Sequence, residues 1–244
     1  MLCHMIVRWR AVREAARGPV VAHALIAGCA VAFVLGPASG LNPAYGTGEE
    51  LLSAGTAYFR RWGVVPDELF TGGPRAWLTP LTALFVHGSW LHLLGNMLFL
   101  YVFGAMAEER MGRPAFLVFY LCTGYLAMAA YAAANAGSPQ TLVGASGAIS
   151  AVLGAFLFLL PRARVTSLFP FLFFLPLRFP AWLVLLFWFA LQWVAAQRAG
   201  SGPGVAYLAH LVGFSLGFLY AWARYRGTTR VRRPATATEG DSQP

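Results

Sequence analysis

Charged residues are scarce in this chain, and lysine is absent altogether. Asp, Glu, Lys and Arg make up 11% of the 244 residues, and all 18 basic residues are arginine. Because soluble domains carry about 25% charged residues, this scarcity argues against a soluble domain. The rest of the composition, 58% hydrophobic, predicts an all-α polytopic membrane protein that is surrounded by the lipid bilayer.

Cysteine is also scarce, and the three cysteines are scattered. Cys3, Cys29 and Cys122 form no Cys-x-x-Cys pair, so no disulfide framework is predicted. In a soluble protein the net charge of +9 would suggest nucleic-acid binding. Here the arginines stand at the ends of apolar runs, where they set membrane topology. No nucleic-acid partner is therefore expected.

Apolar runs of membrane-spanning character recur along the chain and predict a six-transmembrane-helix bundle. The predicted spans cover residues 20–35, 81–107, 115–134, 146–161, 180–194 and 205–225. A cytoplasmic basic lead (1–18) precedes the membrane domain (19–225), and a disordered tail (226–244) follows it. The apolar run 168–177 carries Pro170 and Pro176 and is interpreted as an interfacial connection. Residues 1–40 also fit a cleavable signal peptide in place of a first span.

The distribution of arginine predicts the orientation. With a cytoplasmic N-terminus, 14 of the arginines fall in cytoplasmic segments and 4 in outer ones. The positive-inside rule then places both termini in the cytoplasm and the long first loop, residues 36–80, outside. An amphipathic piece of that loop, 51–62, is suited to the membrane interface. Short ends and the lack of a Ser-rich leader favour the bacterial inner (plasma) membrane.

One short stretch places a serine between glycines at the start of an apolar run. Gly144-Ala145-Ser146-Gly147 presents a hydroxyl with little bulk around it. Small residues in membrane helices also serve close helix packing, so this stretch alone fits either purpose. A second small stripe, formed by His210, Gly213 and Gly217 at positions i, i+3 and i+7, lies on the sixth span.

Packing the two stripes together would bring an imidazole to the serine. The fourth span offers Ser146, Ser150 and Gly154 on one face. His210 would then lie near Ser146, which is the nucleophile–base arrangement of acyl transfer. No Asp or Glu occurs in the third to sixth spans, so the residues allow a Ser-His dyad unless a loop supplies an acid.

Two polar residues on the second span could also belong to the site. His92 and Asn96 are four residues apart and share a helix face. With the Ser146 amide they could donate to an oxyanion, or they could be satisfied by nearby carbonyls. A metal site of His87, His92 and His210 is disfavoured, because their spacing splits a helix face and no acid or cysteine accompanies them. No metal or cofactor is expected.

Hydrolysis within a membrane requires access for water. Ser146 lies about 15 residues from the end of its span, or roughly 22 Å at 1.5 Å per residue. In a core of about 30 Å this is roughly a third of the way in from the outer face. A polar cavity open to the outside is expected, lined by His87, Ser89 and the turn 135–140.

Together these motifs resemble the rhomboid family of intramembrane serine proteases, over roughly residues 76–222. The order and spacing of the motifs are what carry the resemblance, because each motif alone is weak. They are His87, the His-x-x-x-Asn of His92 and Asn96, Glu108-x-Arg110-x-Gly112, Gly144-Ala145-Ser146-Gly147, and Ala209-His210-x-x-Gly213-x-x-x-Gly217.

The resemblance implies an endopeptidase that cleaves single-span membrane proteins near the outer membrane boundary. It implies Ser146 as nucleophile, His210 as general base, and Asn96, His92 and the Ser146 amide as the oxyanion hole. His87, Gly144, Gly147, Ser150, Gly213 and Gly217 would line or support the site. The first loop would be membrane-embedded, and residues 197–204 would cap the site. Transmembrane protein substrates are the implied partners.

The chain departs from the family pattern in two respects. The family commonly carries Trp-Arg in the first loop where this chain has Leu78 and Thr79, although Trp77 is adjacent. Many members also carry an aromatic residue four positions after the serine, stacked on the catalytic histidine, where this chain has Ser150. The first departure concerns the anchoring of the loop and the second the support of His210.

Two other functions fit a chain of this kind. A rhomboid-like protein that binds transmembrane helices without hydrolysing them would keep the fold but lack reactivity at Ser146. A small transporter or channel would be indicated by inverted repeats or by ionisable pairs at mid-membrane, and the sequence has neither.

Overall fold

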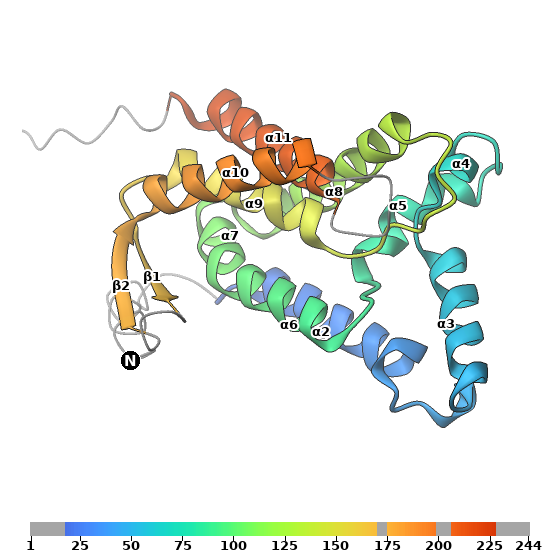
Figure 1. Ribbon diagram of the computed structural model, residues 1–244. Coiled ribbons are helices and arrows are strands. Elements are labelled where there is room, and N and C mark those ends of the chain that lie inside the picture. The colour runs from blue at the N-terminus through green and yellow to red at the C-terminus, as the bar shows by residue number, and fades with distance from the viewer. Residues whose placement is uncertain (1–17, 170–174, 199–205, 228–244) are drawn as a thin grey trace, which may run out of the picture.

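The computed structural model describes residues 18–169, 175–198 and 206–227. It is mostly helical, as predicted for a polytopic helical membrane protein. Figure 1 shows α9 (Ser146–Leu159), α10 (Ala181–Arg198) and α11 (Tyr207–Tyr225) together on one side of the molecule. On the other side lie α2 (Val20–Leu35) and α6 (Trp90–Phe99). Residues 1–17 of the predicted lead, 199–204 of the predicted cap and 228–244 of the predicted tail lie outside the described residues. Gln197 and Arg198, which were predicted as part of the cap, belong instead to the helix before it.

Apart from the second span, the helices of the bundle follow the predicted apolar runs closely. They are α2 (Val20–Leu35), α6 (Trp90–Phe99), η6 (Leu100–Gly104), α7 (Ala105–Met111), α8 (Arg113–Ala134), α9 (Ser146–Leu159), α10 (Ala181–Arg198) and α11 (Tyr207–Tyr225). In the described part of the chain, three helical stretches are long and apolar enough to cross a membrane: Trp90–Met111, Arg113–Ala134 and Ala181–Arg198. The count of six spans stays a prediction.

The second span begins later than predicted. The sequence suggested a start at residue 81, but the continuous helix begins at Trp90. Ahead of it lie two short turns, α5 (Thr79–Thr82) and η5 (Ala83–Phe85), and then non-helical backbone. Ser89 stops any helix from continuing through this point, because its extended backbone makes it the N-cap and its Oγ accepts from the His92 N–H.

The long first loop is built from short helices. They are η2 (Pro37–Ser39), η3 (Pro43–Tyr45), α3 (Glu49–Trp62), α4 (Pro66–Leu69) and η4 (Ala76–Leu78). The amphipathic piece expected at 51–62 lies within α3, which has no buried residue and stands at one end of the molecule in Figure 1. Glutamates at its start and arginines at its end complement the helix dipole.

Backbone pairing anchors this loop beside the site. Val64 and Leu142 exchange two N–H···O=C bonds of 2.9 and 2.7 Å, and the Asp67 N–H donates to Ser138. The loop is thereby attached to the segment that leads into α9. Leu78 and Thr79 lie on the adjoining turns, and Trp77 packs edge-to-face against Phe70 at 5.7 Å.

A β-hairpin interrupts the helical pattern. Strand β1 (Arg164–Phe169) pairs antiparallel with β2 (Leu175–Pro180), between α9 and α10. This part of the predicted connection is not a span, as expected, but its strands were not predicted. In a two-stranded sheet both strands are edges, so Pro176 and Pro180 are tolerated there.

The core is organised around α9. Ten of its 14 residues are buried, and it packs most closely against α11. At three glycines no Cβ could fit: at Gly213 it would collide with the Gly147 carbonyl, at Gly217 with the Ala151 carbonyl, and at Gly154 with the Phe214 carbonyl. The packing of the two small stripes is therefore confirmed.

A buried carboxylate holds α2 against α7. Glu108 is 3% exposed, and its two oxygens accept the N–H groups of Val21 and Ala22 at 3.0 and 2.7 Å. These are orphan donors of the first turn of α2, where an anion also complements the helix dipole. Arg113 lies 3.8 Å from the same carboxylate.

Candidate active site

Ser146 is the first residue of α9 and stands at the end of an extended approach. Before it, Gly144 has a φ of 120°, a conformation that favours glycine, and its N–H donates to Ala83 at 2.9 Å. The chain turns sharply there and enters the helix at Ser146. The hydroxyl is thus presented at a helix N-terminus, as the Gly-x-Ser-Gly pattern predicts.

His210 reaches this serine from α11. Its Nε2 lies 2.8 Å from Ser146 Oγ, and the residue is only 8% exposed. The close backbone contact at Gly213 and Gly147 places the two helices near enough for this bond. A separation of 2.8 Å is within the range in which an imidazole can take a proton from a hydroxyl.

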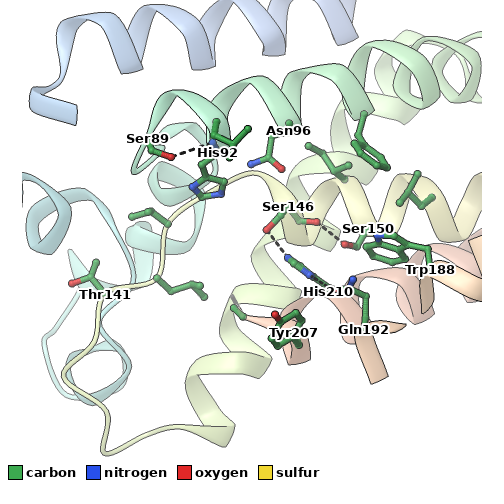
Figure 2. A pocket seen from close by; sticks show the side chains of 18 residues that line it. Ser89, His92, Asn96, Thr141, Ser146, Ser150, Trp188, Gln192, Tyr207 and His210 are labelled. Atoms are coloured by element: carbon green, nitrogen blue, oxygen red, sulfur yellow. Dashed lines mark hydrogen bonds between the residues drawn. The ribbon is translucent and has the colours of Figure 1, made fainter. Parts of the chain in front are cut away.

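His92 and Asn96 approach Ser146 from the opposite side, on α6. Figure 2 shows Ser146 between these two residues and His210. The Gly88 N–H donates to His92 Nδ1 at 3.4 Å, which assigns the remaining ring proton to Nε2. That nitrogen lies against Gly144, where a Cβ would stand only 2.6 Å from it.

Asn96 holds a second donor at the same place. The residue is 9% exposed, and within the described part of the chain its Nδ2 has no hydrogen-bond partner. An amide donor left unpaired in a buried site is costly unless another group uses it. Together with His92 Nε2 it supplies N–H groups near Ser146.

These side chains share one open cavity of about 690 Å³. Its lining includes the side chains labelled in Figure 2: Ser89, His92, Asn96, Thr141, Ser146, Ser150, Trp188, Gln192, Tyr207 and His210. Ser89 lines it as predicted. The turn 135–140 does not, because the segment that reaches the cavity is the one that follows, 141–143.

His87 lies behind His92 and not in the cavity. It is 1% exposed, and its ring centroid is 5.1 Å from that of His92. Burial, and next the neighbouring His92, lower the pKa of His87 to about 4, so its ring is neutral near pH 7. Among the described residues no three His, Cys, Asp or Glu side chains gather into a metal-binding group.

Ser150 and Gly147 serve the packing around the nucleophile. The Ser150 hydroxyl donates to the backbone carbonyl of Ser146 at 2.6 Å, so its polar group is satisfied within α9. A Cβ at Gly147 would come within 3.1 Å of Ala127 Cβ. At the position where many family members carry an aromatic residue, this chain therefore places a small, internally bonded serine.

Two residues of α10 complete the surroundings of His210, and the sequence analysis missed both. Gln192 Oε1 lies 2.8 Å from His210 Nδ1. The Trp188 ring lies one turn earlier, with its centroid 6.1 Å from the imidazole and a tilt of 33°. A strongly polar glutamine inside an apolar run was the available signal, because polar groups in spans are costly and require partners.

Comparison with known proteins agrees with the fold. A sequence model of the Rhomboid domain matches residues 74–227. "Rhomboid protein 1, mitochondrial" of Saccharomyces cerevisiae is 34% identical over 153 residues, which are 61% of this chain and 42% of that protein. "Rhomboid-like protein 11, chloroplastic" of Arabidopsis thaliana is 39% identical over 67 residues, 28% of this chain and 24% of that protein.

The chain thus spans less than half the length of either of these relatives. The family model, however, covers more than half of the chain and includes α6, α9 and α11, which carry the site. The chain therefore belongs to the rhomboid family and is a membrane protein of that fold.

Proposed function

We propose that this protein is an intramembrane serine endopeptidase that uses Ser146 and His210 as a catalytic dyad. The observation that carries the proposal is the 2.8 Å contact between Ser146 Oγ and His210 Nε2, inside an open cavity that also presents N–H donors. A hydroxyl becomes an effective nucleophile only when an adjacent base removes its proton. Family membership supports the same chemistry.

In the first half-reaction, Ser146 Oγ attacks the carbonyl carbon of the scissile peptide bond. The hydroxyl proton passes to His210 Nε2 as the new C–O bond forms. The carbonyl oxygen becomes an oxyanion. When it collapses, the C–N bond breaks and His210 gives the proton to the leaving amine, which leaves an acyl ester on Ser146.

In the second half-reaction, water enters through the open cavity and attacks the ester carbonyl. His210 takes a proton from this water and later returns it to Ser146 Oγ. The C–O bond to the serine breaks, the new carboxylic acid product departs and ionises in water, and the starting dyad is restored. Each step uses side chains of this chain and water.

His92, Asn96 and the Ser146 amide are proposed to bind the oxyanion. The support is that His92 Nε2 and Asn96 Nδ2 both carry protons near Ser146, and that Nδ2 lacks a partner in the described part of the chain. Preorganised donors of this kind stabilise a developing charge far better in a site of low dielectric than in water.

Single-span membrane proteins, cut near the outer membrane boundary, are the proposed substrates. The opening of the cavity beside the start of α9 supports cleavage near one membrane surface. The arginine asymmetry supports cytoplasmic termini, which makes that surface the outer one. The bacterial inner membrane stays a prediction.

A serine-directed fluorophosphonate tests the proposal directly. Purified wild-type protein is expected to become labelled and to cleave a model substrate with helix-breaking residues in its span. Ser146→Ala and His210→Ala should lose both activities. Ser215→Ala, an exposed serine of α11 outside the cavity, is the matched control and should retain them.

Labelling and cleavage by Ser146→Ala at the wild-type rate would refute the dyad. An unlabelled wild-type protein that still co-purifies with transmembrane helices would identify it as a catalytically silent, helix-binding member of the family.

A further inference from the structure

A hydrogen-bonded line runs from the serine through the imidazole to α10. Ser146 Oγ lies 2.8 Å from His210 Nε2, and His210 Nδ1 lies 2.8 Å from Gln192 Oε1. In hydrolases with a full triad, a carboxylate occupies the place that Gln192 takes here. Within the described part of the chain, no Asp or Glu is among the residues that line the cavity.

The tautomer of His210 explains why an acceptor is required there. To receive the proton of Ser146, Nε2 must be unprotonated, so the single ring proton of neutral His210 must reside on Nδ1. A buried N–H on Nδ1 needs an acceptor, and Gln192 offers its amide oxygen. The reversed amide would place an NH₂ group against Nδ1 and favour the tautomer that cannot accept from Ser146.

We propose that Gln192 is the positioning residue of the dyad, which fixes the base-competent tautomer and the ring orientation of His210 in place of a carboxylate. The inference rests on the proposed function. Glutamine suits the site physically, because its oxygen accepts a hydrogen bond without bringing an ionised group into a membrane helix, where a charge is costly.

Trp188 strengthens this assignment to α10. Its ring lies beside the same imidazole, one helical turn before Gln192. Gln192 and Trp188 thus support His210 from α10, and Tyr207 of α11 lies edge-on to the same ring at 6.3 Å. The position where many family members carry an aromatic residue is occupied by Ser150 on α9. Of its 18 residues, only Ala181 and Leu185 of α10 are buried. The contacts of this thinly packed helix with His210 come from two residues one turn apart.

Steady-state cleavage by three variants tests the role. Gln192→Leu removes the acceptor with little change in volume, and we expect kcat to fall about ten- to a hundredfold, the loss typical of one buried hydrogen bond, with KM nearly unchanged. Gln192→Glu restores an acceptor and should recover most of this loss. Gln197→Leu, an exposed glutamine of the same helix outside the cavity lining, should behave as wild type.

The pH profile separates positioning from mere packing. A carboxylate at position 192 favours the protonated imidazole, so the acid limb of kcat/KM for Gln192→Glu should shift to higher pH. The proposal is overturned if Gln192→Leu matches Gln197→Leu in kcat, or if a folded Gln192→Glu is as slow as Gln192→Leu with an unshifted profile.

NMR of the histidine ring nitrogens requires no catalysis, so its result tests the role of Gln192 independently of the proposed function. In Ser146→Ala protein with ¹⁵N-labelled histidine, the His210 ring nitrogens, assigned by their loss in a His210→Ala variant, should report the Nδ1–H tautomer. Adding Gln192→Leu should shift the ring toward Nε2–H, and adding Gln197→Leu should not. An unchanged tautomer in the Gln192→Leu protein overturns the positioning role whether or not the wild type cleaves any substrate.

Discussion

Replacing Gly213 by alanine is expected to separate the dyad. A Cβ at this position would collide with the carbonyl oxygen of Gly147 and lie 3.1 Å from its carbonyl carbon. Ordinary contact requires about 3.5–4.0 Å, and a backbone carbonyl inside α9 cannot swing aside. The α11 helix must therefore retreat from α9 by on the order of 1 Å, one turn from His210.

The expected loss of activity follows from the hydrogen bond between Ser146 and His210. A retreat of this size would lengthen the 2.8 Å contact between Ser146 and His210 to about 3.8 Å, beyond hydrogen-bonding distance. Misplacement of a catalytic group by about 1 Å costs on the order of a hundredfold in rate. That factor corresponds to about 2.7 kcal/mol in the activation free energy.

The assay is kcat/KM for a fluorogenic transmembrane substrate in liposomes, beside the free energy of unfolding in SDS. Gly55→Ala is the control, because this helical glycine of α3 has only a 4.0 Å contact with Phe59. Gly217→Ala serves as a second comparison, since its Cβ would collide with Ala151 two turns away from His210. It should lose comparable stability, about 1–3 kcal/mol, but less activity.

Two outcomes would refute this reasoning. One is a Gly213→Ala protein with kcat/KM within twofold of Gly55→Ala. The other is a Gly217→Ala protein that loses more activity than Gly213→Ala at equal stability, because the loss would then follow general loosening of the helix pair and not the displacement of His210.

Three further predictions concern the proposed oxyanion donors, the helix anchor and the buried imidazole. Asn96→Ala should lower kcat by about 10²–10³ with KM nearly unchanged, which is the usual cost of a lost oxyanion donor. Gly144→Ala should lower kcat at least ~10-fold, because its Cβ would press on the His92 ring in a backbone conformation that strains alanine. For either variant, a rise in KM as large as the fall in kcat would contradict the expectation. Glu108→Ala should reduce the free energy of unfolding by about 1–3 kcal/mol, because two backbone N–H groups of α2 lose their acceptor, and an unchanged unfolding curve would argue against the anchor. Burial lowers the pKa of His87 to about 4 from 6.5. Between pH 6.5 and pH 4 the unfolded chain therefore binds more protons than the folded chain, and the free energy of unfolding should fall as the pH drops through this window. His87→Gln should weaken the pH dependence of thermal unfolding, and identical pH curves for variant and wild type would exclude His87 as its source.

The sequence was sufficient to predict the central helix pair. Small residues at helical spacing around Ser146 and around His210 can pack closely in only a few ways, and both stripes carry one polar group at corresponding ends. The periodicity of an α-helix therefore determines that the hydroxyl and the imidazole face each other. The pairing of His92 with Asn96 follows from the same periodicity.

The sequence predicted less well the two places where tertiary contacts, and not hydrophobicity alone, decide the local structure. The apolar run from residue 81 suggested one continuous helix, but Ser89 caps a helix that starts at Trp90. The apolar connection before α10 was recognised as not spanning, yet its hairpin pairing depends on residues brought together across a turn. The hydropathy of a single segment indicates neither the helix cap at Ser89 nor the pairing of the two strands.

The sequence alone thus determined the membrane class, and it predicted the proposed catalytic pair and the helix face that unites its two members. Only the tertiary structure decided what supports His210. Apart from Gln192 and its C-terminal end, helix α10 is apolar on every side, so no periodic stripe indicates which side faces the bundle. Its rotation is set by packing against α11, and that rotation brings Gln192 and Trp188 to the imidazole.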